Sequence, residues 1–222
     1  MPRKPVIGIT ADLARDDRGF PRHQLRSTYV ESVARAGGVP VILPADEAVR
    51  AAALDALDGV LMTGGDDIDT RPFGVDLHPM ARIMDPLRQS AELALLRALD
   101  ARPAMPVLGI CLGMQLMGVH RGARLIQHLD DVLPDAQRHR ADAIHPVESE
   151  LGSGPVASWH HQAIADAPGF AVVGRSDDGV IEAIRDRGRP FYVGVQWHPE
   201  RTPDARMGLG IVRRFVESAG AK

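Results

Sequence analysis

Short apolar runs alternate along the chain with longer segments in which apolar residues recur every three or four positions. Five runs rich in Val, Ile and Leu are typical of strands buried on both faces of a parallel sheet: residues 6–10 (VIGIT), 40–43 (PVIL), 59–63 (GVLMT), 106–110 (PVLGI) and 191–195 (FYVGV). The alternation of such strands with helices predicts an α/β fold with a mostly parallel sheet.

Three segments carry the helical period, and they cover residues 27–38, 86–102 and 204–220. The first ends at a glycine pair, and the second begins with a proline, a residue favoured at the first helical position. The apolar stripe predicted for the first helix consists of Tyr29, Val30, Val33 and Ala34. We expect these helices to flank the sheet.

Residues 123–195 have a different pattern, in which strand-like pieces are separated by Gly and Asp turns. The pieces are residues 124–129 (RLIQHL), 143–148 (AIHPVE), 170–176 (FAVVGRS) and 180–186 (VIEAIRD). They predict an antiparallel layer added to the sheet. Residues 64–86 lack clear periodicity and predict a long loop, which in a compact domain is often functional. Since no repeat or linker divides the chain, we expect a single domain over residues 1–222.

The composition indicates the cellular compartment and the kinds of partner to expect. The 222 residues are 45% hydrophobic with a net charge of −3, the arginines are scattered, and no apolar stretch reaches membrane-spanning length. One cysteine cannot form an internal disulfide, which agrees with a reducing compartment. We therefore expect a cytoplasmic protein that binds neither nucleic acid nor membrane.

The single cysteine, Cys111, lies in the pattern Gly109-Ile-Cys-Leu-Gly113, between a predicted strand and a predicted helix. Glycines two residues to either side let strand and helix approach closely, as in the G-x-S-x-G nucleophile elbow of hydrolases. A cysteine at this turn projects its side chain, and the helix start favours the thiolate over the thiol. We therefore interpret Cys111 as a nucleophile, although a lone cysteine without such a context is usually an inert core residue.

A thiolate nucleophile needs a base and a group that orients the base. In Trp197-His198-Pro199-Glu200, the proline restricts His198 to extended geometry, in which the side chains of positions 198 and 200 face the same way. Glu200 is then expected to orient the His198 ring and stabilise its charged form.

Attack by a thiolate on a carbonyl creates an oxyanion that needs N–H donors held in place. The backbone N–H of Leu112 at the helix start is one candidate donor. The turn at Gly64 and Gly65, after the third strand, is expected to supply another.

The segments PVLGICLGMQLM, SWHHQAI and GVQWHPE together resemble the class I glutamine amidotransferase-like superfamily, and most closely its peptidase C26 group (γ-glutamyl-γ-aminobutyrate hydrolase-like). The resemblance extends over nearly the whole chain, because further segments occur in the same order as in the family. They are TYVESVARAGGVPVILP, LMTGGDDID followed by RPFG, and DDGVIEAI. The resemblance implies a flavodoxin-like (Rossmann-like) sheet and a Cys-His-Glu triad of Cys111, His198 and Glu200. It also implies cleavage of a small-molecule γ-glutamyl amide through a thioester on Cys111.

The same resemblance implies substrate contacts from Gln115, one turn after the cysteine, and from Trp159 and His160 in the SWHHQ segment. The chain departs from many hydrolase relatives at Leu112, where these carry arginine and glutamine-dependent amidotransferases carry leucine. An alternative function is therefore a glutaminase subunit that supplies ammonia to a synthase partner, and a further one is an inactive binding module.

The sequence contains no motif typical of metal or nucleotide-cofactor chemistry. The sequence contains no HExxH, no CxxC and no carboxylate–histidine cluster at ligand spacing, so we expect no metal, and it lacks a GxGxxG or Walker loop, so we expect no cofactor. Four aspartates of the long loop could attract a cationic leaving group, although such residues are more often solvated caps: Asp66, Asp67, Asp69 and Asp85. The sequence leaves open whether the protein forms a homodimer.

Overall fold

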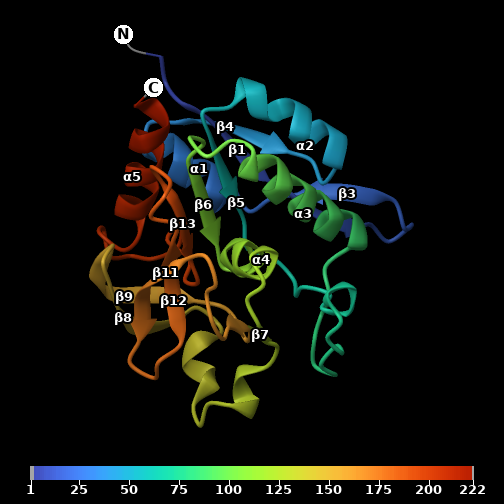
Figure 1. Ribbon diagram of the computed structural model, residues 1–222, viewed down its shortest axis with the longest axis vertical. Coiled ribbons are helices and arrows are strands. Elements are labelled where there is room, and N and C mark those ends of the chain that lie inside the picture. The colour runs from blue at the N-terminus through green and yellow to red at the C-terminus, as the bar shows by residue number, and fades with distance from the viewer. Residues whose placement is uncertain (1–2, 222) are drawn as a thin grey trace.

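One mixed sheet of nine strands runs through the computed structural model, which describes residues 3–221 (Figure 1). Five neighbouring strands are parallel, in the order β4 (Val39–Leu43), β1 (Val6–Thr10), β5 (Gly59–Met62), β6 (Val107–Ile110) and β13 (Tyr192–Val195). Numbered along the chain, these five strands have the spatial order 2-1-3-4-5 of flavodoxin-like folds. The predicted fold class is therefore confirmed.

Burial on both faces was predicted for all five runs, and this is wrong for β4. Val41 is 39% exposed and Ile42 is 53% exposed. The reason is position, because β4 is the outermost strand and has a neighbour on one side only. The other four parallel strands are almost entirely buried.

The antiparallel part continues the same sheet edge to edge instead of covering one of its faces. Its strands follow β13 in the order β12 (Ile181–Arg185), β11 (Ala171–Ser176), β8 (Ala143–Ser149) and β9 (Gly152–Ser158). The strand expected at residues 124–129 is reduced to β7 (Leu125–Ile126), which pairs with β10 (Ala163–Ile164) in a separate ladder. Strand β9 was not expected, because its sequence GSGPVAS has the composition of a turn.

Helices cover both faces of the parallel half. They are α1 (Ser27–Arg35), α2 (Glu47–Ala53), α3 (Pro86–Asp100), α4 (Leu112–His120) and α5 (Leu209–Gly220), with short 3₁₀ turns η1 (Leu54–Ala56), η2 (Arg71–Phe73), η3 (Leu129–Asp131) and η4 (Ala136–His139). Alternate side chains of β6 enter two different cores, one shared with α1 and α5 and the other with α3 and α4. In α1 the buried stripe contains Ser32 in place of the predicted Ala34, which is exposed.

Two segments outside the sheet shape the site. The hairpin of β2 (Asp12–Arg15) and β3 (Pro21–Gln24) extends from the carboxyl end of β1 and lies at the right of Figure 1. The predicted long loop covers residues 64–85 in the structure, because Pro86 is already the first residue of α3, and it is interrupted by η2 and by a bridge between Asp67 and Ile83.

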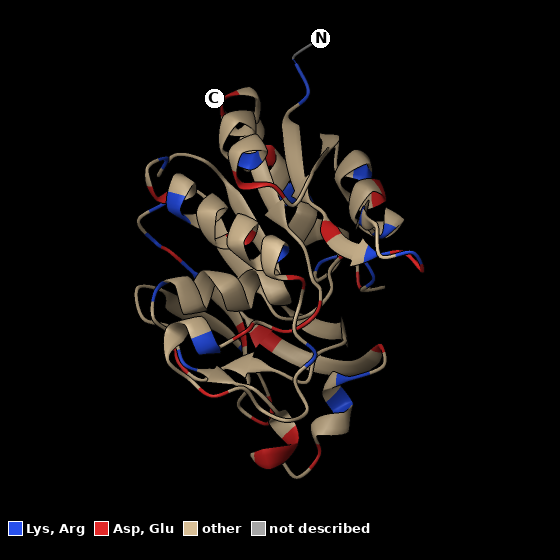
Figure 2. Ribbon diagram, turned by 90° about the vertical axis from the view of Figure 1, so that its right-hand side faces the viewer, with Lys and Arg blue, Asp and Glu red and all other residues tan. Residues whose placement is uncertain are grey.

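Charge is spread over the molecule, with acidic and basic residues interspersed along the ribbon in Figure 2. Within residues 3–221, none of the helices combines the length and apolar composition needed to cross a bilayer.

Candidate functional site

Cys111 lies on the turn between β6 and α4 with φ 53° and ψ −106°, a backbone conformation that L-residues rarely adopt. The flanking glycines explain how the turn fits. A Cβ at position 109 would lie 2.4 Å from the sulfur of Met117, and one at position 113 would lie 2.5 Å from the carbonyl oxygen of Met62. Strand and helix therefore approach more closely than any side chain at these two positions allows.

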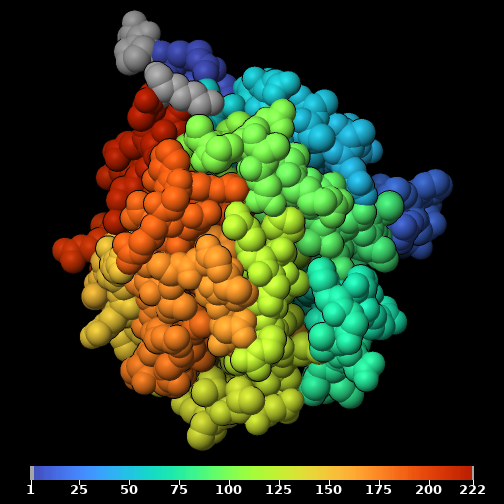
Figure 3. Space-filling model, in the orientation of Figure 1, coloured from blue at the N-terminus to red at the C-terminus, as the bar shows by residue number. Residues whose placement is uncertain are grey.

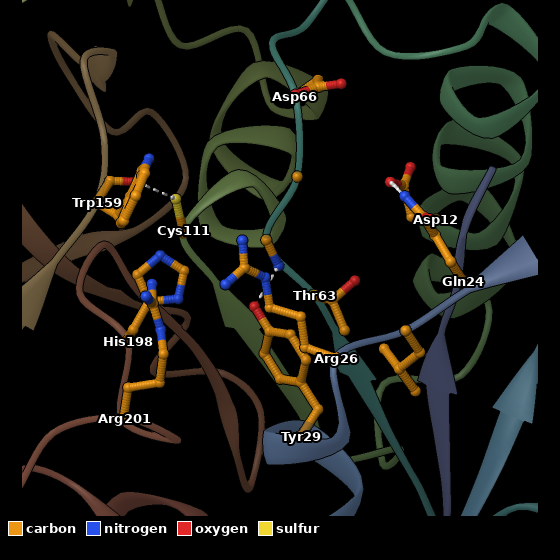
Figure 4. A pocket seen from close by; sticks show the side chains of 13 residues that line it. Asp12, Gln24, Arg26, Tyr29, Thr63, Asp66, Cys111, Trp159, His198 and Arg201 are labelled. Carbon is orange, nitrogen blue, oxygen red and sulfur yellow. Dashed lines mark hydrogen bonds between the residues drawn. The ribbon is translucent and has the colours of Figure 1, made fainter. Parts of the chain in front are cut away.

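His198 and Glu200 follow β13, the strand beside β6. The Nδ1 atom of His198 lies 2.8 Å from Oε1 of Glu200, and both side chains are buried. Burial by itself lowers the pKa of His198, but the negative charges of Glu200 and Cys111 and the hydrogen bonds to them raise it to about 9. The His198 ring is therefore charged at neutral pH and lies beside Cys111 in Figure 4.

The sulfur of Cys111 has two further polar neighbours. Its thiol lies 3.8 Å from the carbonyl oxygen of Trp159, and the side-chain amide of Gln196 donates to it over 3.5 Å. Gln196 directly follows β13, the neighbour of β6, whereas Trp159 directly follows β9, the strand at the far edge of the sheet. The structure thus surrounds the sulfur with groups that hold it in one position.

The Gly64 turn differs from the expectation for an oxyanion site, because its N–H is already used. It donates to the hydroxyl of Tyr29 over 3.0 Å (Figure 4). Burial, reinforced by the charges of Glu200 and Cys111, raises the pKa of Tyr29 well above its ordinary value, so the phenol keeps its proton. A Tyr29 hydroxyl that accepts from Gly64 still has its own proton to donate. Tyr29 is thus a site residue, although the sequence pattern indicates for it only a place in an apolar stripe.

Arg88 of α3 holds the same turn through the carbonyl oxygen of Gly64. Its fully buried guanidinium donates to the Gly64 carbonyl over 2.8 Å and to Oδ1 of Asp12 over 2.7 Å. A Cβ at position 65 would lie 2.1 Å from Nη1 of Arg88, which explains the second glycine. Because C=O and N–H of one peptide unit point in opposite directions, the Gly65 N–H points away from the guanidinium.

Two cavities meet at Cys111. The hairpin cavity, of about 460 Å³, is named for the β2–β3 hairpin and is shown in Figure 4; it is lined by Asp12, Gln24, Leu25, Arg26, Tyr29, Thr63, Gly64, Gly65, Asp66, Cys111, Trp159, His198 and Arg201. The histidine cavity, of about 440 Å³, lies on the other side of Cys111, and its walls include Asp66, Asp67, Met80, Arg82, Gln115, His128, Arg140, Trp159, His160 and His161. A substrate with two halves could therefore place its reacting bond at the sulfur.

The three predicted substrate residues all line the histidine cavity, but they differ in how free they are. Trp159 is 52% exposed and also borders the hairpin cavity. Gln115 is buried, and its amide nitrogen donates to Gln162 O and to Gln196 Oε1, each over 3.1 Å. His160 is 5% exposed, and its Nε2 lies 3.6 Å from Glu182.

The folded chain brings together a carboxylate–histidine cluster that no ligand spacing in the sequence indicates. His139, His145, His160 and Glu182 are buried together with their ligand atoms within 4.8 Å of one another. The four residues lie on separate segments, η4, β8, the end of β9 and β12, so their spacing along the chain carries no metal-binding pattern. The sheet and the η4 turn packed against it bring the four residues together.

Comparisons with known proteins show the family and the fold. The profile of the peptidase C26 family matches residues 5–200. A Mycobacterium tuberculosis protein named "Putative glutamine amidotransferase" is 38% identical over 97% of this chain and 75% of its own length. The gamma-glutamyl-gamma-aminobutyrate hydrolase of Escherichia coli O157:H7 is 30% identical over 88% of this chain and 85% of its own length.

The fold itself has a match among solved structures. The crystal structure of a putative GMP synthase component from Thermoplasma acidophilum gives a TM-score of 0.69 at 19% identity, covering 98% of this chain and 94% of that chain. This match shows the fold alone, and the family profile and the relatives give the family. The chain belongs to the peptidase C26 family of glutamine amidotransferase-like hydrolases.

Proposed function

We propose that the protein is a cysteine hydrolase that cleaves the γ-glutamyl amide bond of a small γ-glutamyl compound and releases glutamate and an amine. The observation that carries the proposal is the position of Cys111, on a turn where two cavities meet and beside the hydrogen-bonded pair of His198 and Glu200. The nucleophile, the base and the group that orients the base are the minimum set for acyl transfer by a thiol.

In the proposed reaction the Cys111 thiolate attacks the γ-carbonyl carbon, and the carbonyl electrons move onto oxygen. Charged His198 then gives its proton to the amine nitrogen as the C–N bond breaks, leaving a γ-glutamyl thioester. Neutral His198 next takes a proton from water, which attacks the thioester carbon and releases glutamate and the thiolate. Glu200 holds the imidazole and stabilises its charge in both half-reactions.

For the oxyanion we propose the N–H of Leu112, the Tyr29 hydroxyl and the N–H of Gly65. The N–H of Leu112 lies in the first turn of α4, where backbone donors lack partners within the helix. Tyr29 stays protonated, and the Gly64 N–H that was expected to act directly orients the Tyr29 oxygen instead. Donors held in this way cost no reorganisation when charge develops.

We assign the glutamyl half of the substrate to the histidine cavity and the leaving amine to the hairpin cavity. The histidine cavity holds Gln115, Trp159 and His160, and it also offers charges of both signs through Asp66 and Arg82. A zwitterionic head group carries a carboxylate and an ammonium group, so it matches such a wall.

A glutaminase subunit is the second candidate. It is favoured by the name of the M. tuberculosis relative, which covers nearly all of this chain, and by Leu112 directly after the cysteine. An enzyme of that kind passes ammonia to a partner and has no use for a cavity that binds a larger leaving group. The size of the hairpin cavity, about 460 Å³, therefore supports the hydrolase.

The test is a comparison of kcat/KM for glutamine and for a series of γ-glutamyl amides, measured as glutamate release by the isolated chain. We expect a γ-glutamyl amide of a small amine to be preferred over glutamine, because binding energy from the larger amine can be expressed as rate. Preference for glutamine throughout the series, or activity only with an added synthase, would establish the glutaminase subunit instead.

A further inference from the structure

The buried cluster of His139, His145, His160 and Glu182 takes no part in the chemical steps of the proposed reaction, although His160 also lines the histidine cavity, and its geometry resembles a coordination site. His139 and Glu182 are completely buried, and His145 and His160 are 2% and 5% exposed. Neither carboxylate oxygen of Glu182 has a hydrogen-bond partner among the described residues. A buried carboxylate without hydrogen bonds is costly unless a positive charge lies next to it.

Three ring nitrogens converge on one oxygen of that carboxylate. Oε1 of Glu182 lies 3.5 Å from Nδ1 of His139, 3.7 Å from Nε2 of His145 and 3.6 Å from Nε2 of His160. These separations exceed a good hydrogen bond. They are close to the edge of about 3.4 Å that separates two ligands of a tetrahedral zinc ion, given its usual distances to nitrogen and oxygen.

The other nitrogen of each ring has a partner that orients the ring. Nε2 of His139 lies 2.8 Å from Asp178 Oδ2, Nδ1 of His145 lies 3.2 Å from Pro146 O, and Nδ1 of His160 lies 2.9 Å from Gln162 O. These acceptors require the N–H at the outer nitrogen, so in each neutral ring the lone pair of the inner nitrogen points to the centre of the cluster. Metal-binding histidines have this arrangement, with the outer N–H donated to a carboxylate or carbonyl.

Three lone pairs and a carboxylate that face one another repel unless a cation lies between them. A proton on one imidazole could bridge only some of the contacts, since hydrogen bonds are directional, whereas a single ion at the centre satisfies all four groups. Among residues 3–221, Ser158 Oγ, 2.7 Å from Nε2 of His145, is the competing partner of these inner nitrogens, and its hydroxyl can rotate. Imidazole and carboxylate together suit zinc among the common ions.

We propose that His139, His145, His160 and Glu182 bind a divalent zinc ion in a closed structural site. Four protein ligands leave no open position for a catalytic water, so the ion acts by holding segments together. It links η4, β8, the end of β9 and β12 directly behind the reaction site. His160 follows Trp159, whose carbonyl contacts the Cys111 sulfur, and the backbone oxygen of Glu182 accepts from the N–H of Gln196.

The experiment uses the full chain without a histidine tag and carrying Cys111→Ala, so that the thiolate cannot bind the metal. The chain is stripped with a chelator and supplied with Zn²⁺ alone; bound metal is counted by elemental mass spectrometry and thermal unfolding is followed. We expect one tightly held ion per chain, a Tm that rises with zinc, and, after replacement by Co²⁺, the strong visible absorption of a tetrahedral site.

Two variants and a control locate the ion. Glu182→Gln should weaken zinc binding more than Asp178→Asn, for which the loss expected for a residue that only orients a ligand is about 10- to 100-fold. His23→Gln, at an exposed histidine of the hairpin, should bind like its parent. Asp178 lies outside the ligand set, so its variant keeps the test valid if Glu182→Gln does not fold. No bound zinc, an octahedral cobalt spectrum, or equal binding by the parent and Asp178→Asn would overturn the proposal.

Discussion

At the scale of single residues, the backbone of Cys111 stores strain. A residue with a Cβ at φ 53° and ψ −106° costs about 1–3 kcal/mol, whereas glycine tolerates the conformation. Glycine also gives the unfolded chain more conformational entropy, worth about 0.4–1 kcal/mol, and this offsets part of the stability gained by relieving the strain. We therefore expect Cys111→Gly to be more stable than Cys111→Ala by about 1 kcal/mol in urea unfolding, with glutamate release absent from both. A glycine variant less stable than the alanine variant would show that the turn is unstrained.

The charge of Glu200 should set the upper pH limit of activity. His198 has a raised pKa of about 9, so its charged form is complete below that pH and is lost as the pH rises through it. Glu200→Gln keeps a hydrogen-bonding group but removes the negative charge. We expect the alkaline limb of kcat/KM to move to lower pH and the rate at the optimum to fall at least about 10-fold.

The matched control for this variant is Glu150→Gln, at an exposed carboxylate that pairs with Arg187. Its pH profile should coincide with that of the parent. An alkaline limb that stays in place in Glu200→Gln would remove Glu200 from the proposed triad.

The site could be predicted from the sequence where a motif is local. Cys111 lies between its own glycines, and His198 and Glu200 are two residues apart, so each pattern is complete within a few positions. Tyr29 and Arg88 contact Gly64 from positions 35 and 24 residues away along the chain, and no local sequence pattern predicts either contact. The histidine–glutamate cluster was missed for the same reason.

At the scale of elements, the hairpin is the feature that the hydrophobic pattern did not reveal. All four residues of β3 are exposed, so no buried face imposes an alternation of apolar and polar positions. Most of the cavity-lining residues in the long loop border the histidine cavity, so the loop lies mainly on the side that we assign to the glutamyl half. By contrast, the central parallel strands were predictable, because burial on both faces requires continuous apolar runs.

Neighbouring hairpin residues offer a matched pair of variants. Gln24 lines the hairpin cavity and donates to Asp12 Oδ2 over 3.1 Å, whereas His23 is exposed and absent from the lining. Consecutive strand residues point to opposite faces. We expect Gln24→Ala to lower kcat/KM for γ-glutamyl amides of larger amines by about 3- to 10-fold, the value of one modest hydrogen bond, with glutamine hydrolysis unchanged.

His23→Ala should leave both activities as they are. Equal losses for glutamine and for the larger amides in Gln24→Ala would mean that the hairpin supports the common part of the site. In that case the leaving amine would have to be assigned to another wall.

At the scale of the whole molecule, the site follows from how the sheet is wound. In a parallel sheet all strands end at the same edge, and β5, β6 and β13 are neighbours there. Gly64, Cys111 and His198 each follow one of these three strands within a few residues. Distant parts of the chain thus meet without any long-range motif, and Figure 3 shows segments from different parts of the chain packed side by side on one face.

A buried ion-pair network behind this edge should dominate the response of the whole fold to mutation. Arg50 and Arg88 are completely buried, and their guanidinium groups lie 3.2 Å and 3.6 Å from Oε1 of Glu92, which is 1% exposed. Nη1 of Arg50 has no hydrogen-bond partner among the described residues. Glu92→Gln would leave two buried cations next to an uncharged amide, and removing one partner of a buried pair costs about 3–5 kcal/mol.

We expect urea unfolding of Glu92→Gln to show a loss of about 3 kcal/mol or more at an unchanged m-value, against a change within about 0.5 kcal/mol for Glu150→Gln on the surface. The double variant Arg50→Met/Glu92→Leu separates charge from packing, because it removes one cation together with its anion. It should recover part of the loss, since apolar side chains of similar size often replace a buried pair without cost. If the double variant were no more stable than Glu92→Gln, the network would stabilise α2 and α3 through its shape and backbone contacts instead of through paired charges.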